Sequence, residues 1–183
     1  SGTAGAFDVT INPNNSYSVD VHVGGNDYAP SDSITLTGSS LGGVDTTNDA
    51  TFSVTTVSKS YTGLTQSSGS LGTGGTFTIS RTGAIYSVTL TFAGSGYTPG
   101  DVLVFLGSQL GGVDVTNNLS ITITEVDIDN GIVLFDTITG VATGTGSIVA
   151  IGAVTGTGVL VKGLINSVSI LTGTSVSGEL SFT

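Results

Sequence analysis

Two loops of this chain gather oxygen-bearing side chains. The stretch "GGVDTTND" contains Asp45, Asn48 and Asp49, and the stretch "GGVDVTNN" contains Asp114, Asn117 and Asn118. Carboxylate and amide oxygens are the ligands that calcium prefers in proteins. Each loop has only one or two carboxylates, however, and Asp and Asn are also the commonest turn residues. The six residues are therefore candidate calcium ligands, with hydrogen-bonded turns as the alternative.

Catalytic side chains are scarce. His22 is the only histidine, the chain has no cysteine, and His22 alternates with Val21 and Val23 as on the solvent side of a strand. A serine nucleophile would need His22 as its base. The eleven Asp and two Glu could hydrolyse glycosides only in pairs, and the sequence pairs none of them. We predict no catalytic residue and no enzyme, and we rank a carboxylate-dependent polysaccharide hydrolase last.

The elements around these residues are predicted to be strands. In "IYSVTLTF", residues 85–92, the side chains of Tyr86, Val88, Leu90 and Phe92 alternate with Ser and Thr, which is typical of a half-buried strand. In the first half of the chain Tyr17, Val19, Val21 and Val23 form the corresponding row. Asn130–Gly131 favours a two-residue hairpin turn between two later strands.

The chain repeats itself at a constant offset. Tyr28 aligns with Tyr97, Asp32 with Asp101 and Asn48 with Asn117, and no gap is needed between the pairs Tyr17/Tyr86 and Val57/Val126. Repetition of this kind indicates two copies of one supersecondary unit.

Composition indicates the fold class. The chain has 29 Gly, only 9% charged residues, and apolar residues that are mostly Val, Ile and Leu, with many Thr. We predict an all-β protein with two related β-sandwich- or barrel-like repeat modules and a Gly-rich C-terminal β segment. The predicted boundaries are residues 1–57 for module 1, 58–75 for a linker or long loop, 76–139 for module 2, and 140–183 for the C-terminal segment.

The C-terminal segment is predicted to mediate oligomerisation. Residues 140–163 alternate short Val and Ile runs with Gly-Thr-Gly turns and carry no charge until Lys162. An uncharged apolar strand edge aggregates unless something covers it. "GLINSVSIL" from Gly163 resembles "GAIYSVTL" from Gly83, which suggests a partial third repeat.

Net charge excludes one class of partner. The formal charge is −10 at pH 7, with only three Lys and Arg, whereas affinity for nucleic acid comes from clustered cations. The sequence also has no apolar run long enough for a transmembrane helix. We expect neither nucleic acid nor membrane as a partner.

Aromatic residues could line a sugar-binding surface. Tyr28, Tyr97 and Phe105 are the candidates, but their positions within the strand patterns also suit core packing. We expect most of them to be core residues.

The segment "GSGYTPGDVLVFLGSQLGGVDVTNNLSITITEVD" resembles a repeat in virion structural proteins of marine, cyanophage-like tailed bacteriophages. The motif features are Gly94–Asp101, Gly107–Gly112 and Asn117–Ile123, and they recur in altered form in Gly25–Asp32, Gly38–Gly43 and Asn48–Val54. In the first copy Asn26 and Asp27 replace Ser-Gly, and Ser31 replaces Gly.

This resemblance implies a non-enzymatic component of a virion, as a fibre, a capsid decoration or a tail protein. It implies self-association through β-strands, as a homotrimer or larger assembly, and contact with other virion proteins. It transfers no catalytic or cofactor-binding residue.

Two alternatives remain from other classes. One is a host-surface module that binds glycan through loops such as "SQLGGVDVTNN", which exposed aromatic residues near those loops would favour. The other is a subunit of a secreted or cell-surface filament that donates a strand to its neighbour. An unpaired N-terminal segment, residues 1–10, would favour the filament.

Overall fold

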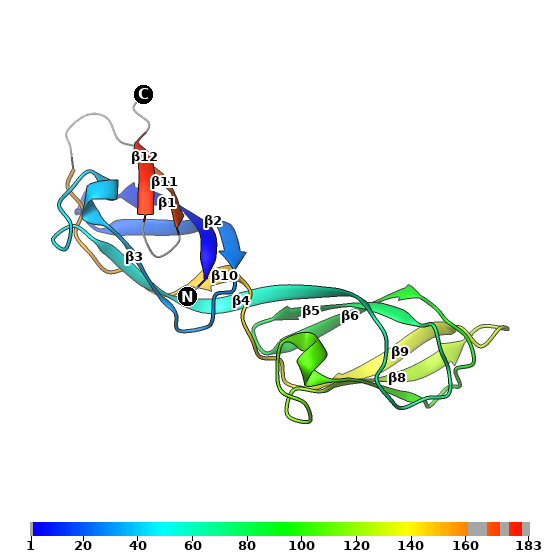
Figure 1. The fold of residues 1–183 in the computed structure, drawn as a ribbon. Coiled ribbons are helices and arrows are strands. Elements are labelled where there is room, and N and C mark those ends of the chain that lie inside the picture. The colour runs from blue at the N-terminus through cyan, green and yellow to red at the C-terminus, as the bar shows by residue number, and fades with distance from the viewer. Residues whose placement is uncertain (1, 161–167, 173–175, 181–183) are drawn as a thin grey trace. The chain divides into compact units, whose positions relative to one another are not determined.

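The computed structural model describes residues 2–160, 168–172 and 176–180 (Figure 1). The fold of the described residues is all-β, with 53% strand arranged in several antiparallel sheets. The helical elements of the described residues are two single 3-10 turns, η1 (Gly38–Leu41) and η2 (Gly107–Leu110). No helix in this part of the chain has the length and apolar character needed to cross a membrane.

The chain forms two compact units. Unit 1 combines Ser1–Val57 with Thr145–Thr183, and unit 2 is Ser58–Gly144. Unit 1 is therefore built from two stretches that are separated in the sequence by the whole of unit 2.

Unit 1 contains a four-stranded sheet of order β12-β11-β1-β2. Its strands are β1 (Thr3–Ile11), β2 (Tyr17–Asn26), β11 (Val168–Thr172) and β12 (Val176–Leu180). The first part of β4 (Ala50–Leu64) pairs with β3 (Ser33–Leu36), and β10 (Ser147–Ile151) lies next to β4.

Unit 2 contains two groups of strands. The second part of β4 pairs with β5 (Thr76–Thr82), which pairs with β6 (Ile85–Phe92). The other sheet has the order β7-β8-β9, formed by β7 (Val102–Phe105), β8 (Leu119–Val126) and β9 (Ile132–Thr139). Figure 1 shows β8 and β9 side by side.

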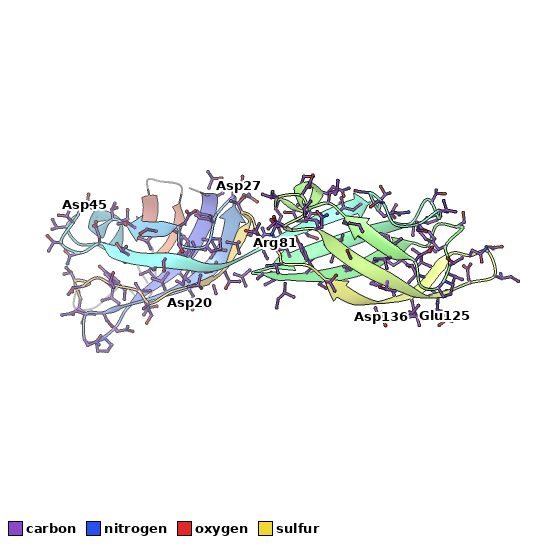
Figure 2. All side chains as sticks on the ribbon, turned by 90° about the horizontal axis from the view of Figure 1, so that it is seen from below. Asp20, Asp27, Asp45, Arg81, Glu125 and Asp136 are labelled. Carbon is purple, nitrogen blue, oxygen red and sulfur yellow. The ribbon has the colours of Figure 1, made fainter. Side chains whose placement is uncertain are left out.

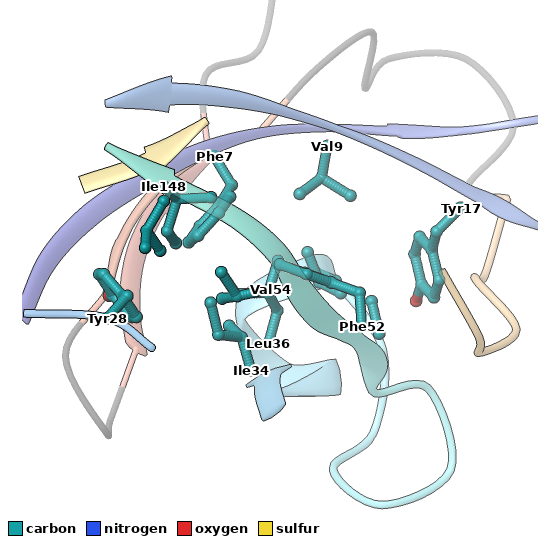
Figure 3. Packing of buried hydrophobic residues seen from close by; sticks show 12 residues of the cluster. Phe7, Val9, Tyr17, Tyr28, Ile34, Leu36, Phe52, Val54 and Ile148 are labelled. Carbon is teal, nitrogen blue, oxygen red and sulfur yellow. The ribbon is translucent and has the colours of Figure 1, made fainter. Parts of the chain in front are cut away.

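Each unit has its own core. In unit 1, Phe7 meets Phe52 edge to face with ring centroids 5.1 Å apart, and Leu36 and Ile148 join the same cluster (Figure 3). In unit 2, Phe77 meets Phe105 edge to face with ring centroids 5.2 Å apart. Alternating apolar residues bring these side chains to one face of each strand, so burial of that face stabilises both units.

The alternation expected of β2 ends before Val23. Tyr17 is buried and Val19 and Val21 are half-buried, but Val23 is 47% exposed. The register between β1 and β2 shifts between Ala6 and Phe7, which pairs Val23 with Ala6 and Val21 with Phe7. Such a bulge adds a residue to one strand and turns later side chains to the other face.

Residues 58–75 differ from the predicted linker. Ser58–Leu64 are strand, because they continue β4 and pair with β5. The remainder is tied down by bridges from Ser68 to Val104 and from Thr73 to Ser95. Most side chains of this stretch are exposed or only half-buried, which agrees with its low apolar content.

The C-terminal segment also differs from the predicted boundary. Residues 140–144 belong to unit 2 and residues from 145 onward to unit 1. β10 lies beside β4 of its own chain, and Thr155 forms a bridge with Thr51. The partial third repeat begins within 161–167, which lie outside the described residues.

The predicted hairpin between β8 and β9 is present, but its turn is longer than two residues. Asn130 has a positive φ of 56°, whereas Gly131 does not. The N–H of Asp127 donates to the Gly131 oxygen, and the Asp127 carboxylate accepts from the N–H groups of Asp129 and Gly131. The Asp127 side chain therefore organises a wider turn.

Candidate functional site

The two Asp- and Asn-rich loops are built from the same hydrogen bonds. Each follows a short strand and a 3-10 turn, and each ends where the next long strand begins: η1 leads to β4, and η2 leads to β8. The glycine after each 3-10 turn, Gly42 or Gly111, has a positive φ near 75°. This left-handed residue reverses the chain and starts the loop.

Asn48 and Asn117 each hold one loop together. The Oδ1 of Asn48 accepts the N–H of Val44 at 2.8 Å, and its Nδ2 donates to the Thr157 oxygen at 2.8 Å. Asn117 repeats this with Val113 at 2.9 Å and Val141 at 2.8 Å. Both amides are buried, so these bonds replace those that the groups would make to water.

Asp49 and Asn118 perform one role with different side chains. The Oδ1 of Asp49 accepts the N–H groups of Gly38 at 2.7 Å and Thr46 at 2.8 Å. The Oδ1 of Asn118 accepts the N–H groups of Gly107 at 2.8 Å and Val115 at 2.9 Å. An acceptor oxygen is thus needed here, and a negative charge is not.

Asp45 and Asp114 close the tips of the loops. Asp45 accepts the N–H of Ser39 at 2.6 Å, and Asp114 accepts the N–H of Ser108 at 2.7 Å. Hydrogen bonds from the Ser39 side chain and backbone hold the pKa of Asp45 below its ordinary value. Bonds from the backbone and side chain of Ser108 likewise lower the pKa of Asp114.

These hydrogen bonds give each of the six candidate calcium ligands a role in holding the loop backbone. Each of them uses Oδ1 to accept at least one backbone N–H, so the loop interior presents N–H groups toward those oxygens. Within the described residues, no three His, Asp or Glu side chains come close enough to share a metal ion. The hydrogen-bonded turn is sufficient to explain the residue types.

His22 lies on the outer face of β2. Its Nδ1 is 3.2 Å from Oδ2 of Asp8 on the neighbouring strand, and the side chain is 61% exposed. The acidic residues of unit 1 that Figure 2 labels, Asp20, Asp27 and Asp45, lie apart from one another. His22 thus pairs with Asp8 across two strands, and the serine that bonds Asp45 is Ser39 of the same loop.

The three aromatic candidates for sugar binding are core residues. Tyr28, Tyr97 and Phe105 are at most 4% exposed, and the ring of Tyr97 packs against Gly72. The Asn- and Asp-rich loops contain no aromatic residue. A glycan-binding surface made by these three rings is therefore ruled out by their burial.

Arg81 was not singled out by the sequence. It is 1% exposed, and it follows Phe77 and Ile79 on the inward row of β5 (Figure 2). Burial raises the pKa of the neighbouring Tyr86, and the charge of Arg81 opposes this. The alternation of β5 was the signal that could have revealed the buried cation.

A shallow groove of about 430 Å³ lies in unit 1 between β2 and β10. Val19, Asp20 and Val21 form one wall, and residues 149–152 form the other. Both strands are at the ends of their sheets, so the groove is a gap between two sheet edges. Asp20 is the only ionisable residue that lines it.

No protein-family model matches the chain, and no curated protein and no solved structure matches it.

Proposed function

We propose that this chain is a non-enzymatic structural component of a bacteriophage particle, as a fibre, a capsid decoration or a tail protein. In this proposal it resides in the virion, contacts other virion proteins and assembles with copies of itself through β-strands. The resemblance of residues 94–127 to phage virion repeats supports it. The hydrogen bonds that the repeated Asp and Asn side chains make to their own loop backbone support it independently.

The observation that carries the proposal is the shared bonding of the two loops. Asn48, Asp49 and Asp45 use Oδ1 to hold their own backbone, and Asn117, Asn118 and Asp114 do the same in the second copy of the repeat. Side chains arranged to fix backbone make a rigid scaffold, and a duplicated scaffold extends a surface. That is what an assembly subunit needs.

In the same proposal, each unit is one β-sandwich-like module, and unit 2 is inserted into a hairpin of unit 1. Tyr28 donates its N–H to the Gly146 oxygen, and Tyr97 donates its N–H to the Asn130 oxygen. Asn48 reaches Thr157, and Asn117 reaches Val141. In the sequence, Gly146 follows Asn130 and Thr157 follows Val141 by the same number of residues. This offset is much shorter than the one between the two copies of the repeat. This is the result of placing unit 2 where unit 1 would have its turn.

The strand sequences support this insertion. "IVLFDTITG" begins at Ile132 and "IVAIGAVTG" begins at Ile148, which is the same short offset. Ile132 and Ile148 are both buried, and Gly140 and Gly156 have φ values of 137° and 135°. Residues 148–156 therefore supply to unit 1 the strand that β9 supplies to unit 2.

The donated-strand filament is not favoured by the N-terminus. Residues 3–11 form β1, which pairs with β2 inside unit 1. A donor strand from this segment would have to leave its own sheet first.

Purified phage particles whose genome encodes this sequence test the proposal. Quantitative mass spectrometry should find the chain in intact particles, in several copies per particle. Its absence from particles, together with its presence in the host envelope, would contradict a virion role.

A further inference from the structure

The outer edge of β7 in unit 2 is covered by a short segment of its own unit. Val104 of β7 donates its N–H to the Ser68 oxygen at 3.0 Å and accepts the N–H of Ser67 at 2.8 Å. The next residue, Gly69, has a φ of 112°, and a Cβ at this position would collide with the Val102 oxygen. Ser67, Ser68 and Gly69 therefore form an edge cover, and its close approach to β7 requires the glycine.

The aligned edge of β3 in unit 1 has no such cover. Thr35 aligns with Val104 in the repeat and lies opposite Thr51 of β4. Thr51 exchanges both of its backbone hydrogen bonds with Thr155 on its other side. Opposite residues of an antiparallel pair either bond each other or both point outward, so the N–H and the oxygen of Thr35 point away from β4. Within the described residues no hydrogen bond reaches these two groups, and Thr35 is exposed whereas Val104 is half-buried.

The C-terminal strands repeat the sequence of the edge cover and of the strand before it. Residues 167–180 match residues 58–71 without a gap, and the glycine that the cover requires is conserved between the two stretches. The residues that recur are Ser58, Ser60, Thr65, Ser68, Gly69 and Leu71, as Ser167, Ser169, Thr174, Ser177, Gly178 and Leu180. β11 also pairs with β1 as the second part of β4 pairs with β5. β12 is therefore the sequence counterpart of the edge cover.

In the single chain β12 does not pair with β3. It folds back on β11, with Ser177 opposite Leu171 and Gly178 opposite Ile170. The edge cover of unit 2, by contrast, arrives from another unit, because β4 pairs with β3 in unit 1 before its second part enters unit 2. The chain thus already contains one strand that leaves a unit and completes the next one.

We propose that β11 and β12 of one copy complete unit 1 of a second copy, where β11 pairs with β1 and β12 covers the edge of β3. This inference rests on the proposed self-assembly and names its surfaces. Ser177 of the first copy bonds the backbone of Thr35 of the second, as Ser68 bonds Val104. Gly178 then lies beside Ser33, the residue that aligns with Val102.

Exchange of these strands keeps most of the bonds of the single chain. Each copy gives one β11 and receives another, so the pairing with β1 forms again between copies. β12 gives up its pairing with β11, and in return the outward backbone groups of Thr35 gain a partner. The donor and the acceptor surfaces differ, so the contact is head-to-tail and builds an open row of subunits, which is the arrangement that a fibre requires.

Cysteine cross-linking tests the contact, because the chain has no cysteine of its own. Thr35→Cys and Ser177→Cys in one chain should give a ladder of covalent multimers on a denaturing gel after mild oxidation of the folded protein. Val104→Cys with Ser68→Cys is the matched control, since this bridge lies within one chain, and its disulfide should leave the protein monomeric. A disulfide inside single chains of the first variant, or none, would overturn the exchange.

One position of the edge cover differs between the two stretches. In unit 2 the Ser70 hydroxyl donates to Asp101, whereas the aligned residues of the proposed contact are Glu179 and Asp32. Two neighbouring carboxylates repel each other. Glu179→Ser should therefore lower the protein concentration needed for assembly at least two-fold, and an unchanged concentration would contradict this placement of β12.

Gly178→Val tests the same contact without cross-linking. A side chain here collides with the strand edge that Gly69 approaches in unit 2, so the native mass in light scattering should fall at least two-fold. Ser177→Val is the control and should keep the wild-type mass, because its counterpart Ser68 is exposed. Circular dichroism should show both variants folded. Assemblies that persist in Gly178→Val would refute the β12 contact while self-assembly stands, and a wild-type monomer would refute both.

Discussion

Tyr17 donates its phenolic hydrogen to the main-chain oxygen of Asn48 at 2.6 Å, and Tyr86 does the same to Asn117 at 3.1 Å. Both bonds are buried, and both join the first long strand of a repeat copy to its Asn-containing loop. Burial raises the pKa of both phenols above its usual value, so they remain neutral donors. A bond that recurs in the two halves of one chain marks the loops as structural.

Removal of either hydroxyl should weaken the fold. Tyr17→Phe and Tyr86→Phe each leave a buried carbonyl without its donor, which costs about 1–3 kcal/mol. Urea unfolding followed by circular dichroism measures this. Wild-type stability in both variants would mean that the loops are held by their other bonds alone.

Asp49 and Asn118 should be interchangeable. Each accepts two backbone N–H groups through Oδ1, so Asp49→Asn and Asn118→Asp should change the free energy of unfolding by less than about 0.5 kcal/mol. Alanine at either position removes the acceptor and should cost about 1–3 kcal/mol. A large loss on Asp49→Asn would show that the charge itself matters.

Replacement of Val115 by asparagine should stabilise the protein. Its φ is 71°, in the left-handed region that a β-branched residue adopts only at a cost of about 1–3 kcal/mol, and its side chain is 86% exposed. Val115→Asn keeps the backbone N–H that Asn118 accepts and should raise the melting temperature. Val113→Asn is the matched control, since Val113 is exposed but its φ is not positive.

The contribution of Asp101 to the stability of the fold should be lost at acid pH. Its carboxylate accepts the Ser70 hydroxyl at 2.7 Å and the Thr98 N–H at 2.9 Å, and these bonds lower its pKa. A folded-state pKa below the unfolded one adds stability that is complete above the unfolded pKa and is lost as the pH falls through the folded pKa. NMR titration should therefore show a higher Asp101 pKa in Ser70→Ala than in wild type. Identical titrations would mean that Ser70 contributes nothing.

The sequence predicted local features well because they depend on near neighbours. The alternation in β8, the alternation in β6 as far as Leu90, the all-β class and the turn after Val126 follow from side-chain periodicity and turn residues, whereas Phe92 at the end of β6 is 65% exposed. Buried Tyr97 and the bonded side chain of Asn117 follow from the same patterns.

The nested order of the units escaped prediction because it depends on a distant pairing. Thr51 forms a bridge with Thr155, and the whole sequence of unit 2 lies between these two residues in the chain. The stretch from Ile148, which resembles β9, consists only of short Val-, Ile- and Gly-rich segments. The fixed offset of the repeat ends at Val57, where the chain enters unit 2. The second, shorter offset, which relates Ile132 to Ile148, was the available signal.

The central claim is that this chain is an assembly subunit, and the native mass of the purified full chain tests it most directly. Light scattering with and without a calcium chelator should give a mass of at least two chains of 18.1 kDa that the chelator does not change. A stable 18.1 kDa monomer at high concentration would contradict the account. An assembly that dissociates on chelation would show that calcium binds and that the Asp- and Asn-rich loops do more than hold their own backbone.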